Sequence, residues 1–195
     1  MTTTKESGFA PNDNRKKQQR RMALAARAAL SPQERQAASI AICRRLMALP
    51  EVQNARVILS YAATAEEVSL SALHQWLHQQ GKVLAFPVTE GAGVMHAVRA
   101  EQDTPWQVGR YGISEPQGEM LPPEELDLVL TPCVAFDERC RRLGHGGGYY
   151  DRYLPRCPQA LRIAAAFEAQ KLSEISTDSH DLPMDRVVTE RCVYE

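Results

Sequence analysis

A glycine-rich segment constrains the fold of this chain more than any other stretch. Residues 141–154 read Arg-Arg-Leu-Gly-His-Gly-Gly-Gly-Tyr-Tyr-Asp-Arg-Tyr-Leu, and four of the eleven glycines of the chain lie within five positions there. The apolar run 126–134 before it predicts a buried strand, and residues 149–154 predict the start of a helix. Glycines let backbone N–H groups approach a phosphate closely, and a helix start adds unpaired donors. The segment therefore predicts an anion cradle.

Standard nucleotide-binding motifs do not describe this loop. A Walker A loop needs a lysine and a serine or threonine after its last glycine, but two tyrosines follow here. A dinucleotide fingerprint that begins at Gly144 would need a glycine at position 149. Two arginines precede the loop and Arg152 follows it, which favours phosphate binding over a turn needed only for tight packing.

The regular elements expected from the pattern alternate between strands and helices. The basic, alanine-rich run 15–30 favours a helix, and Ser31 with Glu34 forms a capping box for the next one. A strand–helix–strand order predicts an α/β fold with a mostly parallel sheet. The expected strands are 56–61, 82–86 (ended by Pro87), 94–98, 127–131 and 161–167, the further helices are 31–49, 70–80 and 169–175, and 99–123 is a long loop.

Two segments carry a more specific resemblance. Residues 127–137, Asp-Leu-Val-Leu-Thr-Pro-Cys-Val-Ala-Phe-Asp, and 142–152, Arg-Leu-Gly-His-Gly-Gly-Gly-Tyr-Tyr-Asp-Arg, resemble the signature of the 5-formyltetrahydrofolate cyclo-ligase family. The resemblance extends from about Lys16 to Glu190. It implies a single three-layer α/β domain of the NagB/RpiA/CoA-transferase-like arrangement. It also implies conversion of 5-formyltetrahydrofolate, with or without a polyglutamate tail, to 5,10-methenyltetrahydrofolate, using ATP and magnesium and releasing ADP and phosphate.

The resemblance also implies roles for individual residues. Arg142, Tyr149 and Asp151 match catalytic positions, and Asp151 and Asp181 match the magnesium ligands. The positions that match ATP-binding residues are Lys16, Arg20, Arg142, Leu143, Gly144, His145, Gly146, Gly147, Gly148, Tyr149 and Tyr150. The positions that match folate-binding residues are Glu67, Tyr111, His145, Gly146, Gly147, Gly148 and Tyr149.

Several of these assignments have alternatives. Lys16 and Arg20 lie on one helix face at i and i+4, but Lys17 and Arg21 offer a competing register, and a basic run on composition alone indicates a solvated face. Asp185 is an alternative to Asp181, because magnesium takes one or two carboxylates together with phosphates and water. The acidic pair at 66–67 could equally be an exposed helix start, and Tyr111 could anchor its loop to the core.

The chain departs from the family pattern at four positions. Gly147 stands where many members carry a basic residue, so Arg142, Arg141 or Arg152 must supply the charge. Ser69 replaces a threonine. Two cysteines, at 133 and 140, replace glycines, so a backbone conformation that favours glycine would be strained there.

Composition limits the class of protein. We expect a tail at 1–13 that is disordered and one cyclo-ligase domain at 14–195. Five cysteines, an odd number without a Cys-x-x-Cys pair, indicate a cytoplasmic protein, and the net charge of −1 argues against nucleic-acid binding. No apolar run approaches the length of a membrane span, so we expect no membrane partner, and we expect a monomer. Two rival hypotheses are a non-catalytic nucleotide sensor and an RNA-associated protein. The carboxylates at 151 and 181 favour the enzyme, since a magnesium–ATP site needs them.

Overall fold

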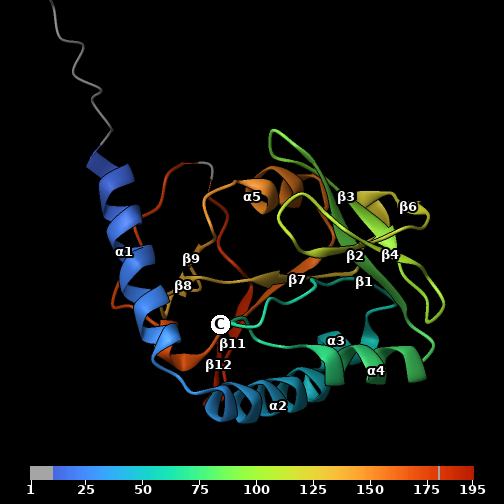
Figure 1. Ribbon diagram of the computed structural model, residues 1–195, viewed down its shortest axis with the longest axis horizontal. Helices are drawn as coiled ribbons and strands as arrows, with labels where there is room; N and C mark the ends of the chain where they lie inside the picture. Colours follow the sequence, from blue (N-terminus) through green and yellow to red (C-terminus); the bar gives the residue numbers. More distant parts are fainter. Residues whose placement is uncertain (1–10, 180) are drawn as a thin grey trace, which may run out of the picture.

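A computed structural model describes residues 11–179 and 181–195. Its centre is a twisted eight-stranded sheet in the order β12-β11-β10-β7-β1-β2-β3-β6 (Figure 1). These strands are β1 (Val57–Leu59), β2 (Val83–Gly91), β3 (Val94–Arg99), β6 (Met120–Leu121), β7 (Leu128–Pro132), β10 (Leu161–Ala165), β11 (Arg186–Val188) and β12 (Val193–Tyr194). The neighbouring strands β11, β10, β7, β1 and β2 are parallel, and the others pair antiparallel. The expected α/β fold with a mostly parallel sheet is confirmed.

Helices cover both faces of this sheet. The helical segments are α1 (Pro11–Ala28), α2 (Pro32–Ala48), α3 (Pro50–Asn54), α4 (Ser71–Gln79), α5 (Tyr149–Tyr153), and the 3-10 turns η1 (Pro123–Glu125), η2 (Leu154–Arg156) and η3 (Glu168–Gln170). In Figure 1, α2, α3 and α4 lie below the sheet and α5 lies above it. Consecutive buried residues point to opposite sides, since Ile58 packs with Leu73 of α4 and Leu59 packs with Tyr153 of α5.

The connections place two loops at one point of the sheet. From β1 the chain continues to β2 on one side, whereas β7 continues to β10 and β11 on the other, and β1 and β7 are neighbours. Loops 60–70 and 133–148 therefore leave neighbouring strands where the strand order reverses, the usual location of ligand sites in α/β sheets. The second loop forms a hairpin of β8 (Ala135–Phe136) and β9 (Arg142–Leu143), and the glycine-rich segment joins β9 to α5.

Strand β2 is longer than expected, because Pro87 does not end it. Its pairing with β1 ends at Ala85, and within the described residues β2 pairs beyond that point with β3 alone, with Pro87 opposite Ala97. A proline is tolerated there because no strand of the described chain pairs with the open side of β2, so the missing N–H breaks no hydrogen bond of the sheet. The sequence expectation failed because it treated proline as a stop without knowing which strand edge was paired.

Three other expectations need correction. Residues 11–13 form the first turn of α1 rather than part of the tail, and residues 1–10 lie outside the described part of the chain. The helix expected at 169–175 is only the short turn η3, because the following backbone bonds the β8 hairpin: Leu172 N donates to Phe136 O, and Ile175 N donates to Asp137. The long loop 99–123 contains β6 and a small hairpin of β4 (Trp106–Val108) and β5 (Ser114–Pro116).

None of the described helices combines the length and the apolar character that a bilayer span requires.

Helix α2 shows how local sequence determines one element. Ser31 accepts a hydrogen bond from Glu34 N, the Glu34 side chain accepts one from Ser31 N, and a proline occupies the first turn. The expected helix and its capping box are confirmed. Ile42 and Leu46 of this helix are buried, whereas Ile40 is exposed.

Loss of this cap should weaken the domain measurably. We expect Ser31→Ala to lower the free energy of unfolding by about 1 kcal/mol, because Glu34 N loses its acceptor. Urea unfolding followed by circular dichroism measures the change. Ser31→Asp is the control, since it keeps an acceptor and should retain most of the stability. Equal loss in both variants would contradict a capping role.

Candidate functional site

Helix α1 presents one buried stripe to the rest of the protein. Lys16 (5% exposed), Ala23 and Arg27 (4% exposed) are buried, and Arg20 on the same stripe is half-buried. The spacing follows the helical repeat, so these side chains share one face. Lys17 and Arg21 lie in the exposed part of the helix. The geometry therefore favours the register with Lys16 and Arg20 over the alternative.

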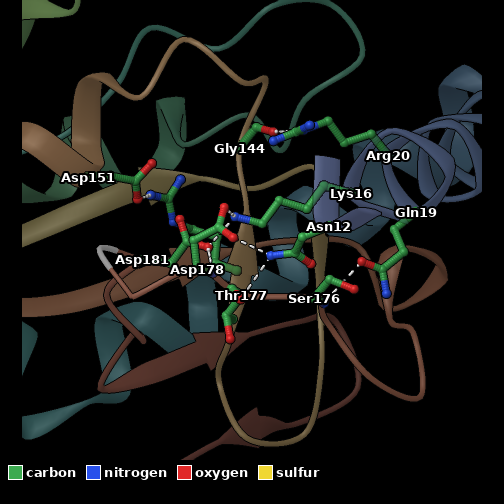
Figure 2. Close-up of polar contacts among 11 residues, drawn as sticks. Asn12, Lys16, Gln19, Arg20, Gly144, Asp151, Ser176, Thr177, Asp178 and Asp181 are labelled. Atoms are coloured by element: carbon green, nitrogen blue, oxygen red, sulfur yellow. Dashed lines mark hydrogen bonds and ion pairs between the residues drawn. The ribbon is translucent and has the colours of Figure 1, made fainter. Parts of the chain in front are cut away.

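Arg20 connects this stripe to the glycine-rich loop. Its Nε donates to the carbonyl oxygen of Gly144 at 2.8 Å (Figure 2). Gly146 and Gly148 have φ angles of +100° and +65°, a region that favours glycine. A Cβ at Gly147 would lie 2.9 Å from the Tyr149 ring, so a side chain there would require that ring to shift. The loop is thus shaped by glycine and held against α1.

The segment before residue 180 is joined to α1 by polar contacts (Figure 2). Gln19 donates to the carbonyl oxygen of Glu174 at 2.7 Å and accepts from Ser176 N at 3.0 Å. Asn12 donates to the carbonyl oxygen of Thr177 at 3.1 Å. These bonds hold two ends of the sequence side by side.

Lys16 is paired with two carboxylates, one in that segment and one just after residue 180. Its Nζ donates to Asp178 Oδ2 at 2.6 Å and to Asp181 Oδ2, and Asp181 Oδ2 also accepts from Asp178 N at 2.7 Å (Figure 2). Burial lowers the pKa of Lys16, but the hydrogen bonds to Asp178 and Asp181 outweigh it, so the pKa lies above its ordinary value. The ammonium group therefore stays charged at neutral pH, and Asp181 lies next to a predicted ATP ligand.

Arg142 is buried beneath the glycine-rich loop. Its Nη2 donates to Asp151 Oδ1 at 3.1 Å, its Nη1 donates to Pro132 O at 3.4 Å, and its guanidinium lies 5.6 Å from the centre of the Tyr150 ring. Burial raises the pKa of Tyr150, and the charge of Arg142 opposes this shift. The structure thus brings the predicted catalytic arginine and the predicted metal ligand Asp151 into contact.

The other two arginines proposed to supply charge are used differently. Arg141 donates to the buried Asp137 at 2.7 Å. Arg152 donates to the carbonyl oxygens of Gly147 at 2.6 Å and Gly93 at 3.3 Å. Both side chains therefore support the backbone around the loop, and Arg142 remains the best-placed cation beside Asp151.

Glu67 meets the loop from the opposite side. It lies in the loop that follows the carboxyl end of β1, and its Oε1 is hydrogen-bonded to Nε2 of His145 at 3.0 Å. Thr64 N also donates to Glu67 at 2.9 Å. Burial raises the pKa of Glu67, but these hydrogen bonds together lower it below its ordinary value of 4.5. Glu67 is therefore a charged carboxylate beside the loop rather than part of an exposed helix start.

Tyr111 and Tyr149 form an exposed aromatic pair. Their hydroxyl oxygens are 2.7 Å apart, and their ring centres are 5.9 Å apart in an edge-on arrangement. Tyr111 is 59% exposed, which does not fit a residue that anchors its loop to the core. The structure thus brings together two predicted folate-binding residues that are 38 positions apart.

Asp185 and the two cysteines at 133 and 140 have simpler roles. Asp185, the alternative to Asp181, forms a bidentate ion pair with Arg162 (Nε–Oδ2 2.9 Å, Nη2–Oδ1 2.8 Å) at the amino ends of β11 and β10. The glycine-rich loop lies at the other end of the strands, beyond the carboxyl ends of β1 and β7. Cys140 has a φ of +56°, so the expected strain is present there, whereas Cys133 is not among the positive-φ residues of the described chain.

Sequence reasoning missed three residues that build the site. Asn12 and Gln19 lie on the same face of α1 as Lys16, and the helical repeat could have identified them. Asp178 carried no recognisable signal, because its role depends on how the segment before residue 180 folds back onto α1.

The contact between His145 and Glu67 can be tested by titration. We expect His145→Ala to raise the pKa of Glu67, because burial would remain while a stabilising donor is lost. NMR detection of the side-chain carboxyl carbon measures this pKa. In the native protein, the stability that this shift contributes should be present above pH 4.5 and disappear as pH falls through the lowered pKa. An unchanged pKa in the variant would contradict the contact.

Comparison with known proteins identifies the family of this chain. The model of the 5-formyltetrahydrofolate cyclo-ligase family matches residues 12–190. The 5-formyltetrahydrofolate cyclo-ligase of Mus musculus is 31% identical, with 83% of this chain and 87% of that protein covered. The protein of the same name from Haemophilus influenzae is 32% identical, with 81% and 88% covered.

A solved structure is also similar. The 5,10-methenyltetrahydrofolate synthetase of Aquifex aeolicus superposes with a TM-score of 0.82 at 34% identity, covering 92% of each chain. The range matched by the family model contains the glycine-rich loop, both loops at the switch point and the residues that pair with Lys16. This chain therefore belongs to the 5-formyltetrahydrofolate cyclo-ligase family.

Proposed function

We propose that this protein converts 5-formyltetrahydrofolate to 5,10-methenyltetrahydrofolate in an ATP-dependent reaction. The observation that carries the proposal is the convergence of cations on the glycine-rich loop. Arg20 reaches it from α1, Lys16 lies on the same face of α1 beside Asp178 and Asp181, and Arg142 lies beneath the loop beside Asp151. A glycine-shaped backbone flanked by buried cations suits a phosphate chain.

The chemistry explains why a phosphate site is needed. The formyl group on N5 is an amide, and its oxygen is a poor leaving group. Transfer of the γ-phosphoryl group of ATP to that oxygen releases ADP and leaves an iminium carbon that bears the phosphorylated oxygen. N10 then attacks this carbon and loses its proton, the ring closes, and the oxygen departs with the phosphate. The protein's task is positioning and charge stabilisation.

The loop separates two groups of ligand-binding residues in this proposal. Lys16 and Arg20 hold the ATP phosphates, and Arg142 stabilises the transferring phosphoryl group. On the other side, Glu67 and the Tyr111–Tyr149 pair hold the folate. Glu67 is charged and fixed by His145, which suits a hydrogen bond to the amino-pyrimidine part of a pterin. The exposed aromatic pair offers a surface for a flat heterocycle.

Magnesium fits this site only together with ATP. Asp151 is paired with Arg142 and Asp181 with Lys16, and among the described residues no group of three or more histidine, cysteine or acidic side chains could hold a metal. Two carboxylates suit an ion that takes its other ligands from phosphates and water. Asp151 and Asp181 would hold it, and it would neutralise charge on the phosphates.

Arg142 gives a sharp kinetic test of this assignment. We expect Arg142→Ala to lower kcat by about 100-fold or more, because it removes a donor to the transferring group. Steady-state assays with purified protein measure the loss. The control is Arg139→Ala on the same hairpin, whose side chain is exposed and should leave the rate unchanged. Turnover of Arg142→Ala near that of the native protein would refute the role.

The overall reaction is tested by the near-ultraviolet absorbance of the methenyl product. We expect the band to grow only when 5-formyltetrahydrofolate, ATP and magnesium are all present. Asp181→Asn should lose most of this activity, and its magnesium requirement should shift to higher concentration. Asp103→Asn, an exposed acidic position on a distant loop, is the matched control.

The outcomes separate the hypotheses. A band that survives unchanged in Asp181→Asn would keep the enzyme and remove the magnesium assignment. ATP binding without any band would contradict the cyclo-ligase proposal and favour a nucleotide sensor.

A further inference from the structure

The ion pair that Arg27 forms does not explain why its side chain is buried. It lies in the last turn of α1, on the stripe that carries Lys16 and Arg20, and its side chain is only 4% exposed. Its contact is a 3.3 Å ion pair from Nη2 to Glu66, whose side chain is 60% exposed. An ion pair with an exposed partner contributes little to stability. It does not offset the burial of a guanidinium group.

Most of that guanidinium lacks an acceptor. Nε and Nη1 of Arg27 are buried and have no hydrogen-bond partner within the described residues, and the same holds for Nε of Arg142 and the hydroxyl of Tyr150. These are four of the six such atoms in the described chain, so unsatisfied donors concentrate on three residues. Buried charged donors without acceptors are costly, and such groups mark places where a ligand completes the structure.

The three residues belong to one region. Arg142 donates to Pro132 O, next to Cys133, and lies against the Tyr150 ring. Arg27 pairs with Glu66, and the next residue, Glu67, is hydrogen-bonded to His145 of the glycine-rich loop that follows Arg142. Consistent with this placement, the charges of Arg142 and Arg27 both oppose the rise that burial causes in the pKa of the Cys133 thiol. One turn before Arg27, Ala23 packs with Ala135 and Leu143 of the β8–β9 hairpin.

A role at the end of the helix does not account for these facts. A cation in the last turn of a helix is favoured by the exposed carbonyl groups there. Such a side chain would donate to those carbonyl oxygens or extend into water. Arg27 does neither with Nε or Nη1, since both atoms are buried and unbonded within the described residues.

We infer that Arg27, with Arg142 and the Tyr150 hydroxyl, binds one tetrahedral phosphoryl group at the carboxyl end of β7. The open Nε and Nη1 of Arg27, the open Nε of Arg142 and the Tyr150 hydroxyl can all donate hydrogen bonds, which suits a dianionic group with several acceptor oxygens. The inference rests on the proposed function, in which this group is the one transferred from ATP and released as phosphate. Arg27 thereby becomes a further residue in contact with the reacting group.

The site can be probed directly with inorganic phosphate. We expect phosphate, at constant ionic strength in a buffer without other oxyanions, to raise the Tm of the native protein, whereas glutarate should not. In Arg27→Met the dissociation constant for phosphate, from calorimetry, should rise about 10-fold or more. Arg44→Met, which removes an exposed arginine from α2, is the matched control and should bind phosphate normally.

Stability without ligand distinguishes binding from a structural role. Because Arg27→Met replaces an unsatisfied buried charge by an apolar side chain, its Tm without phosphate should be no lower than that of the native protein. The inference would be overturned if Arg27→Met had a lower Tm or failed to fold while Arg27→Lys showed a normal phosphate response. A lysine keeps the charge but loses the fork, so weaker phosphate binding is expected there as well.

Kinetics separate this inference from the proposed function. If the reaction occurs, Arg27→Met should lower kcat about 100-fold while KM for folate changes little, because the contact forms with the transferring group. Cyclo-ligase activity with no phosphate binding, or with the same kcat in the variant, would overturn the inference and leave the function standing. Phosphate binding that depends on Arg27 in a protein without this activity would support the site and refute the function. A Tm rise with glutarate would instead indicate a carboxylate site.

Discussion

The burial of one ammonium group determines how the two ends of this chain are arranged. Lys16 is almost fully enclosed, and a buried charge is tolerated only when it is paired. Its partners, Asp178 and Asp181, are 162 and 165 positions away, so the pairing requires the chain on both sides of residue 180 to lie against α1. Once α1 is held there, Arg20 reaches the carbonyl oxygen of Gly144. The pairing of Lys16 therefore also places Arg20 against the glycine-rich loop.

This arrangement explains why the site lies outside the layered core. The sheet and the helices on its faces bury the apolar residues, and the strand order places loops 60–70 and 133–148 next to each other. In Figure 1, α1 stands at one side of these layers rather than within them. Its buried stripe carries Arg20, which contacts the loop, and residues 143–148 of the loop contain no lysine or arginine. In our account, Arg142 beneath the loop and Arg27 on α1 supply the positive charge that this loop lacks.

The sequence predicted what local chemistry determines. The capping box at Ser31 and the apolar strand β7 were found because their signals lie within a few residues of the element itself. Pro87 was misjudged because its tolerance depends on which edge of β2 is paired, and the helix expected at 169–175 failed because its backbone bonds the β8 hairpin instead. The choice between Lys16 and Lys17 also needed tertiary information. Arg27 looked like any other residue of a basic helix until its burial was known.

The central claim is that the site moves a phosphoryl group from ATP to the formyl oxygen of the folate. The most direct test uses 5-formyltetrahydrofolate with heavy oxygen in the formyl group and mass analysis of the phosphate formed in a single turnover. The account predicts one heavy oxygen in each phosphate released, because the oxygen leaves bonded to phosphorus. Unlabelled phosphate, with the heavy oxygen in water, would contradict it.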